Sequence, residues 1–147
     1  MEKITFDSGI QEYEINGKGI LRFNPSDPNV YDRLFHSLDE IKAVESELVE
    51  EAKKINSDDG SAVLRLMAQA DKQVKNILSD IFGHDNDFDD ILGGVNVMAV
   101  CGNGERAITN LLNALIPIIQ AGAEQCARQQ ADKAVEEAKA ARALRLK

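Results

Sequence analysis

The sequence predicts a mainly α (α+β) protein, a helical bundle with a small N-terminal antiparallel β-hairpin or sheet. Three observations support this fold class. Apolar residues recur at helical spacing through most of the chain after Pro28, and an Asn-Gly pair separates two strand-like runs before it. Aromatic residues make up only 5% of the chain, so its core must be mostly aliphatic, which suits packing between helices.

The segment from Lys3 to Asn24 predicts strands. The runs KITF and QEYEI alternate polar and apolar residues, and GILRF is rich in strand-forming residues. Asn16 and Gly17 separate the last two runs, and both tolerate the positive φ angles of tight hairpin turns. Gly19 leaves room for a β-bulge, so more than one register is open. An isolated hairpin is marginally stable in water, so we expect this one to pack on its own helices or on another copy's strands.

Asp27 and Pro28 mark the beginning of the first long helix. Asp is a preferred N-cap, and Pro fits the first helical position because its missing N–H would have no partner there. We expect this helix to end near Ile55, before the turn-forming run NSDDG. Its apolar stripe is interrupted at Glu45 and consists of Tyr31, Leu34, Leu38, Ile41 and Leu48.

A second helix is predicted from near Ser61 to Gly83, packed antiparallel on the first. Its residues at alternating steps of four and three are Val63, Met67, Ala70, Val74, Ile77 and Ile81. The run NDFDDILGG predicts one short helix that begins after Asn86 or Asp87. The following run, VNVMAVCGNG, fits either a short strand or a buried loop.

A last helical pattern follows Glu105, and we expect Pro117 to kink or divide it. Beyond Gly122 the chain is rich in Ala, Glu, Lys and Arg, which favour helix but leave little to bury. The sequence shows no internal repeat and no clear second domain. The predicted organisation is a single domain over residues 1–126, with a β element over 1–25 and helices over 27–126, and a charged Ala-rich helical tail over 127–147.

Composition argues against several classes of partner. The net charge of −8 disfavours binding to a phosphate backbone. The N-terminus lacks the apolar run of a signal peptide, and the densest apolar run, LLNALIPIIQAGA, is too short to span a membrane. Cys101 and Cys126 form no spaced framework, so two reduced thiols in a cytosol are expected. We therefore expect no nucleic-acid partner and no membrane partner.

Two motifs resemble ligand sites but lack the context that such sites require. Gly102, Gly104 and Ala107 fit the dinucleotide pattern G-x-G-x-x-A, yet no second parallel strand is predicted after the helix. The run DNDFDD has the carboxylate spacing of a calcium loop, but Asp90 and Asn96 occupy its Gly and Glu positions. We therefore interpret the first run as a plain turn and the second as a carboxylate-rich helix beginning.

A nucleophilic site is not predicted either. Neither His36 nor His84 stands at a recognised metal-ligand spacing from Cys101 or Cys126. A catalytic thiol needs a base and an orienting group, and the sequence suggests neither. We therefore expect no enzymatic activity, no cofactor and no metal site.

Association with other chains is the remaining use for the apolar surface. The run LLNALIPII is apolar on nearly all sides, which fits a central buried helix or part of a groove for another chain. Burial in the core accounts for the same side chains. The residues predicted to contact a partner are Leu111, Leu115, Ile118 and Ile119, with Tyr31 and Phe35 as further candidates.

Short motifs in the N-terminal half carry a resemblance to a known family. They are Phe6-Asp7, Tyr13-Glu14, Asn16-Gly17-Lys18 and Phe23-Asn24-Pro25, then Asp27, Tyr31 and Leu34, and later ILSDIFG over residues 77–83. In this order they resemble the tail assembly chaperones encoded by long-tailed phages and prophages of low-GC Gram-positive bacteria. The Ala-rich tail adds nothing to the resemblance.

The resemblance implies a non-enzymatic chaperone that binds the tape measure protein, keeps its long hydrophobic helices from aggregating and helps recruit tail tube protein subunits. It also implies a location in the cytoplasm of the bacterial host and absence from the mature virion. The N-terminal hairpin offers an edge through which copies could form a homo-oligomer. Two alternatives stay open at this point: a structural tail or connector component, and a small helical adaptor protein.

Overall fold

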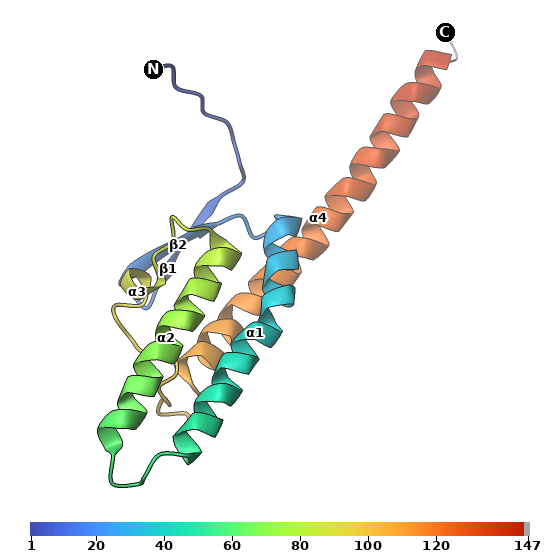
Figure 1. The fold of residues 1–147 in the computed structure, drawn as a ribbon. Helices are drawn as coiled ribbons and strands as arrows, with labels where there is room; N and C mark the ends of the chain where they lie inside the picture. Colours follow the sequence, from blue (N-terminus) through green and yellow to red (C-terminus); the bar gives the residue numbers. More distant parts are fainter. Residues whose placement is uncertain (146–147) are drawn as a thin grey trace.

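The computed structural model describes residues 1–145 and is mainly helical, with an antiparallel hairpin near its N-terminus (Figure 1). This architecture confirms the predicted fold class. The elements in chain order are β1 (Gln11–Ile15), β2 (Gly19–Phe23), α1 (Pro28–Lys53), α2 (Gly60–Phe82), α3 (Phe88–Ile91) and α4 (Ala107–Arg145).

The hairpin turns at the expected Asn-Gly pair. Asn16 and Gly17 have φ angles of 52° and 69°, and the Lys18 N–H donates to the Ile15 carbonyl at 3.0 Å. Ile15 pairs with Gly19, and this register continues to the pair of Gln11 with Phe23. A Cβ on Gly19 would lie 2.3 Å from the Cα of Ile91. Gly19 therefore allows α3 to approach the hairpin, a role that the sequence pattern does not reveal.

The prediction of a strand over KITF is wrong. Residues 1–10 form no strand in the structure and are exposed, and Figure 1 shows them leading away from the body as an arm. The alternation of Ile4 and Phe6 suits a strand, but a strand also needs a neighbour for its backbone hydrogen bonds. Within the described residues the sheet has two strands only, β1 and β2. We call residues 1–7 the N-terminal arm.

Helices α1 and α2 form the predicted antiparallel hairpin, and the Asp27 side chain caps α1 by accepting from the Asn29 N–H. Helix α2 begins one residue earlier than expected, because Asp59 caps it by accepting from the Ala62 N–H. Gly83 ends α2 with a φ angle of 108°. The facing stripes place these residues in the core: Leu34, Ile41, Leu48, Ala70, Val74, Leu78 and Ile81.

Helix α3 is short and closes the far edge of the hairpin. Asp87, one of the two residues that the sequence offered for this position, caps it by accepting from the N–H groups of Asp89 and Asp90. The buried Asn86 side chain accepts from the Arg22 N–H at 2.9 Å and donates to the Arg22 carbonyl at 2.8 Å. It also donates to the Phe82 carbonyl at 3.0 Å. Asn86 thus pairs with the edge of β2 as a neighbouring strand would.

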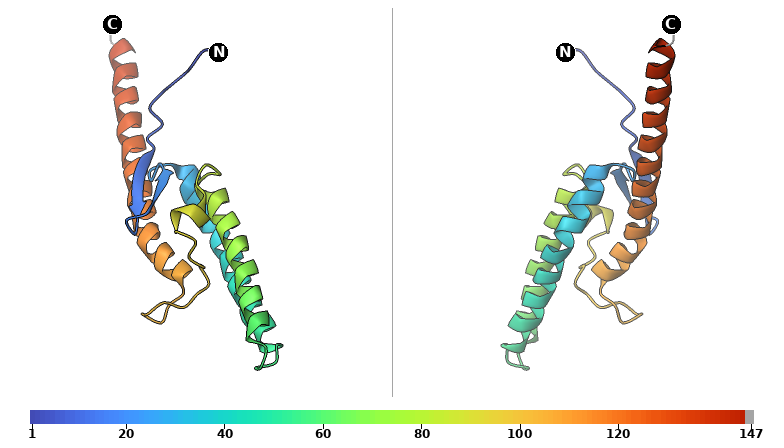
Figure 2. Two further views of the ribbon diagram at one scale, coloured as in Figure 1. Left: turned by 90° about the vertical axis from the view of Figure 1, so that its left-hand side faces the viewer. Right: turned by 90° about the vertical axis from the view of Figure 1, so that its right-hand side faces the viewer.

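Residues 92–106 form the connection before α4, which resolves the ambiguous run as a loop that is exposed over most of its length. Val97 and Met98 are almost fully buried there, and Val100 and Arg106 form an isolated bridge. Helix α4 then continues through Pro117 without a break, so the proline does not divide it. Pro117 is exposed, and Figure 2 shows that α4 bends in this part of the helix.

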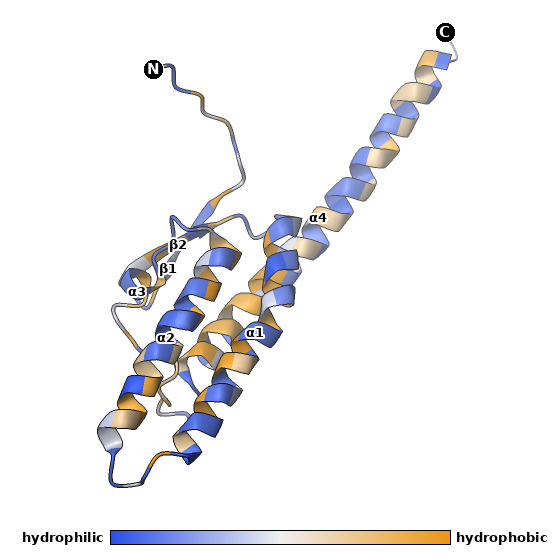
Figure 3. Ribbon diagram, viewed as in Figure 1, coloured by the Kyte–Doolittle hydropathy of each residue, from blue (hydrophilic) through white to orange (hydrophobic). Residues whose placement is uncertain are grey.

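The second half of α4 projects from the body (Figure 1). The last close contact of α4 with the body before this half is at Gly122, which lies against the backbone of Pro25. A Cβ at this position would lie 1.9 Å from the Pro25 carbonyl oxygen. Residues 127–145 of the predicted tail are helical and exposed, and residues 146–147 lie outside the described part of the chain. Figure 3 shows hydrophilic and apolar residues mixed along this segment, whereas the apolar faces of the other long helices turn inward. Within residues 1–145 no helix is long and apolar enough to cross a membrane.

Candidate partner-binding site

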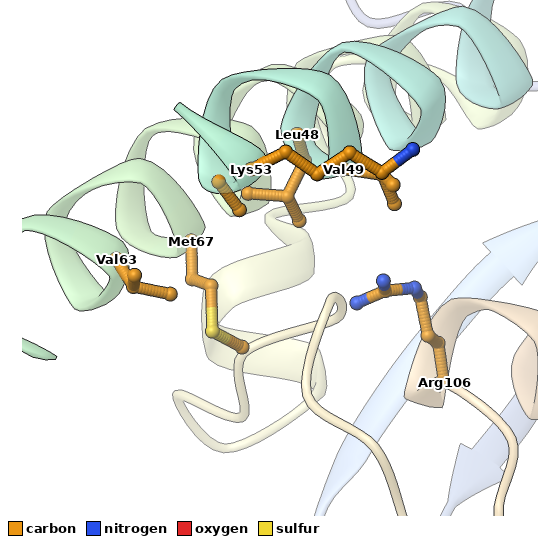
Figure 4. A pocket seen from close by; sticks show the side chains of 7 residues that line it. Leu48, Val49, Lys53, Val63, Met67 and Arg106 are labelled. Carbon is orange, nitrogen blue, oxygen red and sulfur yellow. The ribbon is translucent and has the colours of Figure 1, made fainter. Parts of the chain in front are cut away.

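An apolar groove opens at the end of the α1/α2 hairpin where the turn joins the two helices. It holds about 370 Å³ and is shown in Figure 4. We call it the helix-tip groove, and its lining residues are Leu48, Val49, Ala52 and Lys53 of α1, Val63 and Met67 of α2, and Arg106 before α4. Figure 2 shows why it exists: the α1/α2 hairpin and the beginning of α4 diverge from each other.

At the groove, the apolar stripes along which α1 and α2 pack are only partly covered by the rest of the chain. Ala70 and Val74, farther along α2, are buried, but Val63 and Met67 are only partly buried. Val49 on α1 is 36% exposed, and α1 and α2 supply most of the lining. An apolar groove between two helices is the kind of surface that accepts an amphipathic helix from another protein.

Cationic side chains border this apolar surface. The Arg106 Nε lies 3.1 Å from a Glu45 carboxylate oxygen, and its Nη1 donates to the Met98 carbonyl at 2.6 Å. These contacts hold the Arg106 side chain across the groove from α1, as Figure 4 shows. The Lys53 Nζ lies 3.2 Å from Glu50 at an exposed position. Both cations therefore already have a carboxylate partner on α1, and the surface that the groove offers to another chain is mainly apolar.

A second hollow of about 440 Å³ lies between the hairpin and α4. We call it the strand-edge hollow, since β1 contributes to its wall and β2 does not. Its lining residues are Tyr13, Glu14, Ile15 and Asn16 of the hairpin, Leu92, Val95, Val97 and Cys101 of the loop, and Ala107, Asn110, Leu111, Ala114, Leu115 and Ile118 of α4.

The six predicted contact residues do not form one surface. Leu111, Leu115 and Ile118 line the strand-edge hollow, although Leu115 is only 2% exposed. Ile119 is fully buried in the core. Tyr31 and Phe35 lie against each other on α1 with tilted rings whose centroids are 4.6 Å apart, and Tyr31 is the more exposed of the two. The lining of the helix-tip groove includes none of the six, so the contact prediction overlooked this groove.

A partial signal for the helix-tip groove was present in the sequence. Val63 and Met67 belong to the periodic stripe of α2, but the stripe alone does not show where its partner helix stops covering it. Leu48 belongs to the α1 stripe in the same way. Periodicity identifies an apolar face, whereas its cover depends on where α1, α2 and α4 diverge.

A partly buried ion cluster, in which Lys75 and Asp71 are buried and Asp89 is exposed, joins α2 to α3 and to the loop that follows. The Lys75 Nζ lies 3.0 Å from Asp71 and 2.6 Å from Asp89, and the other Asp71 oxygen accepts from the Val97 N–H at 2.7 Å. Burial acts to lower the pKa of Lys75, but its hydrogen bonds to Asp89 and Asp71 give a net increase. The hydrogen bond from Lys75, with the attraction of its charge, lowers the pKa of Asp89. Each buried charge has partners, so the cluster fits a structural role.

The motifs considered for catalysis or ligand binding have structural partners of their own. Among the calcium-like carboxylates, Asp87 caps α3 and Asp89 pairs with Lys75. Gly102 and Gly104 lie in an exposed turn before α4. The described residues contain no group of three or more His, Cys, Asp or Glu side chains placed to hold a metal ion.

The histidines and cysteines are likewise dispersed. His36 lies 3.1 Å from Asp32 and His84 lies 2.9 Å from Asp80, and in each pair the two exposed residues are four positions apart. Cys101 is exposed in the loop and Cys126 is partly buried on α4, and neither is in a disulfide.

Comparisons with protein-family models, curated proteins and solved structures found no match for this chain.

Proposed function

We propose that this protein is a non-enzymatic phage tail assembly chaperone whose helix-tip groove holds apolar helical segments of the tape measure protein. The helix-tip groove carries the proposal. Its lining is apolar, two helices form most of its walls, and Lys53 and Arg106 stand at its rim. A long helical client with apolar stripes would bury those stripes in the groove and would be protected from aggregation.

Two properties of the chain support this proposal. The N-terminal motifs resemble those of the chaperone family, including Asn16-Gly17-Lys18 and Phe23-Asn24-Pro25. The net charge of −8 favours solubility while an apolar client is bound. In the proposed role the protein also helps recruit tail tube subunits, acts in the cytoplasm of the bacterial host and is absent from the finished virion.

Co-expression with the tape measure protein of the same genome tests the proposal. We expect the wild-type chain to keep the tape measure protein soluble and to co-purify with it. Val49→Glu places a charge at the groove, so soluble client should fall several-fold. Leu64→Glu is the matched control, because Leu64 is 66% exposed on α2 and does not line the groove. This control should behave like the wild type.

Three results would contradict the proposal. The wild-type chain could leave the tape measure protein insoluble, Val49→Glu and Leu64→Glu could have equal effects, or the gene could lie in a genome without a tape measure gene. Mass spectrometry of purified virions separates the main alternative, because a structural tail or connector component would be retained in the particle.

A further inference from the structure

The N-terminal arm has the pattern of a strand but lacks a partner within the chain. Ile4 and Phe6 are 88% and 81% exposed, so their apolar surface stays in water in the single chain. They stand two residues apart, which places both side chains on one face of an extended strand. Large apolar side chains that alternate in this way stabilise a strand only when another surface covers them.

The corner before β1 fixes the arm in a position away from its own hairpin. The Asn24 Nδ2 donates to the Ser8 carbonyl at 3.2 Å, and the Asp7 carboxylate accepts from the Gly9 N–H at 2.9 Å. Gly9 has a φ angle of 75°, which glycine adopts without strain. Figures 1 and 2 show that the residues before this corner leave the body.

The hairpin offers one strand edge for pairing. The Asn86 side chain already occupies the far edge of β2, through both backbone groups of Arg22. The sheet formed by the described residues ends at β1 on its other side. The strand-edge hollow lies beside β1, since Tyr13 and Ile15 of this strand line it together with Leu111 and Ile118 of α4.

We propose that the N-terminal arm of one copy adds as a strand to β1 of a second copy and places Ile4 and Phe6 in the strand-edge hollow. Backbone hydrogen bonds to the edge of β1 supply the pairing, and the hollow supplies pockets for alternate side chains. The opposite face of the arm carries Lys3, Thr5 and Asp7, which then stay outside the hollow.

The second copy, rather than the same chain, is the occupant for a geometric reason. Pairing within one chain would require the arm to reverse at Ser8 and Gly9, where Asn24 holds the corner in the outward direction. Extended, the seven residues of the arm reach about 23 Å, which is enough to cover β1 of a neighbour. Reciprocal exchange gives a dimer, and one-way exchange gives a chain of copies.

Light scattering during gel filtration of the full chain tests this inference. We expect a mass of at least twice 16.1 kDa at micromolar concentrations. The single substitutions Ile4→Asp and Phe6→Asp should each raise the dissociation constant at least about tenfold, since each removes one large buried side chain from the interface. Thr5→Lys is the matched control, because residue 5 lies on the opposite face of the arm, and it should keep the wild-type mass. All three sites are exposed, so circular dichroism should show an intact fold.

The native thiol in the hollow gives a second measurement. Cys101 is exposed in the single chain and lines the strand-edge hollow. Its alkylation should be several-fold slower in the assembled wild type than in Phe6→Asp, whereas alkylation of Cys126 should not change. A monomeric wild type with a protected Cys101 would show that the arm folds back on its own chain and would overturn the proposal. A monomer with a reactive Cys101, or an oligomer that survives both substitutions, would also overturn it.

This inference does not rest on the proposed function. The arm substitutions leave the helix-tip groove intact, and Val49→Glu leaves the arm intact. A failure of one proposal is therefore distinguishable from a failure of the other.

Discussion

Asn86→Ala tests the inference that one side chain replaces a third strand at the edge of the hairpin. Asn86 is 5% exposed and makes three hydrogen bonds: two with the backbone of Arg22 and one with the Phe82 carbonyl. The substitution removes all three bonds and leaves partly buried backbone groups without protein partners. At about 1 kcal/mol for each bond, we expect a loss of about 3 kcal/mol in the free energy of unfolding.

Urea unfolding and differential scanning calorimetry measure this loss. For a chain of this size, about 3 kcal/mol corresponds to a decrease of roughly 6–12 °C in the unfolding midpoint. Asn86→Asp should destabilise the protein at least as much, because a carboxylate oxygen would then face the Arg22 and Phe82 carbonyls. The control is Asn76→Ala on the exposed face of α2, which should change stability by less than about 0.5 kcal/mol. A loss below about 1 kcal/mol for Asn86→Ala would refute the reasoning.

Three further predictions concern the ion cluster, α4 and the tail. Asp89→Asn should remove part of the acid sensitivity of folding. Because the pKa of Asp89 is lowered in the folded protein, its contribution to the free energy of unfolding is present above about pH 4 and is lost as the pH falls through the folded pKa. In urea titrations the stabilities of the wild type and the variant should therefore converge at low pH. Gly122→Ala should lower the unfolding midpoint despite the higher helix propensity of alanine, because the new Cβ would meet the Pro25 carbonyl. Gly60→Ala is the control, because the space around Gly60 is open, and it should be neutral or stabilising in the same calorimetric scan. Removal of residues 127–147 should reduce the helical circular dichroism signal but shift the midpoint by less than about 3 °C, since the described part of this segment is exposed, and a shift of 10 °C or more would show that the tail packs on the body.

The sequence predicts local structure well where a local interaction determines it. Asp27 and Asp87 cap helices because their carboxylates reach backbone N–H groups two or three residues later. Asn16 and Gly17 form the hairpin turn because both adopt positive φ angles. The stripes of α1 and α2 meet as expected because apolar faces at helical spacing must be covered.

Features that depend on distant parts of the chain were missed or wrongly predicted. Gly19 and Gly122 are needed because backbone from other elements lies against them, and neither neighbour is visible in the local sequence. The run KITF alternates like a strand, but alternation does not supply a pairing partner. At Pro117 only the suggested division is wrong, because α4 continues through the exposed proline and bends in that part of the helix.

The candidate site was predicted only in part for a related reason. Periodicity identified Leu48, Val63 and Met67 as apolar positions without showing that α4 diverges from them and leaves a groove. The apolar run LLNALIPII supplied Leu111 and Ile118, which line the strand-edge hollow, together with Ile119, which is buried. Composition predicts how much apolar surface the chain has, whereas the angles between helices determine which part stays uncovered.

Photo-crosslinking from the helix-tip groove tests the central claim most directly. A benzophenone amino acid at position 49 places the reactive group at the groove, and the same group at position 64 places it on the exposed α2 surface outside the groove. With the tape measure protein co-expressed, position 49 should crosslink to its apolar helical segments, and position 64 should give little product. Equal crosslinking from both positions, or none from position 49 while the two proteins co-purify, would contradict the proposed binding of the client in this groove.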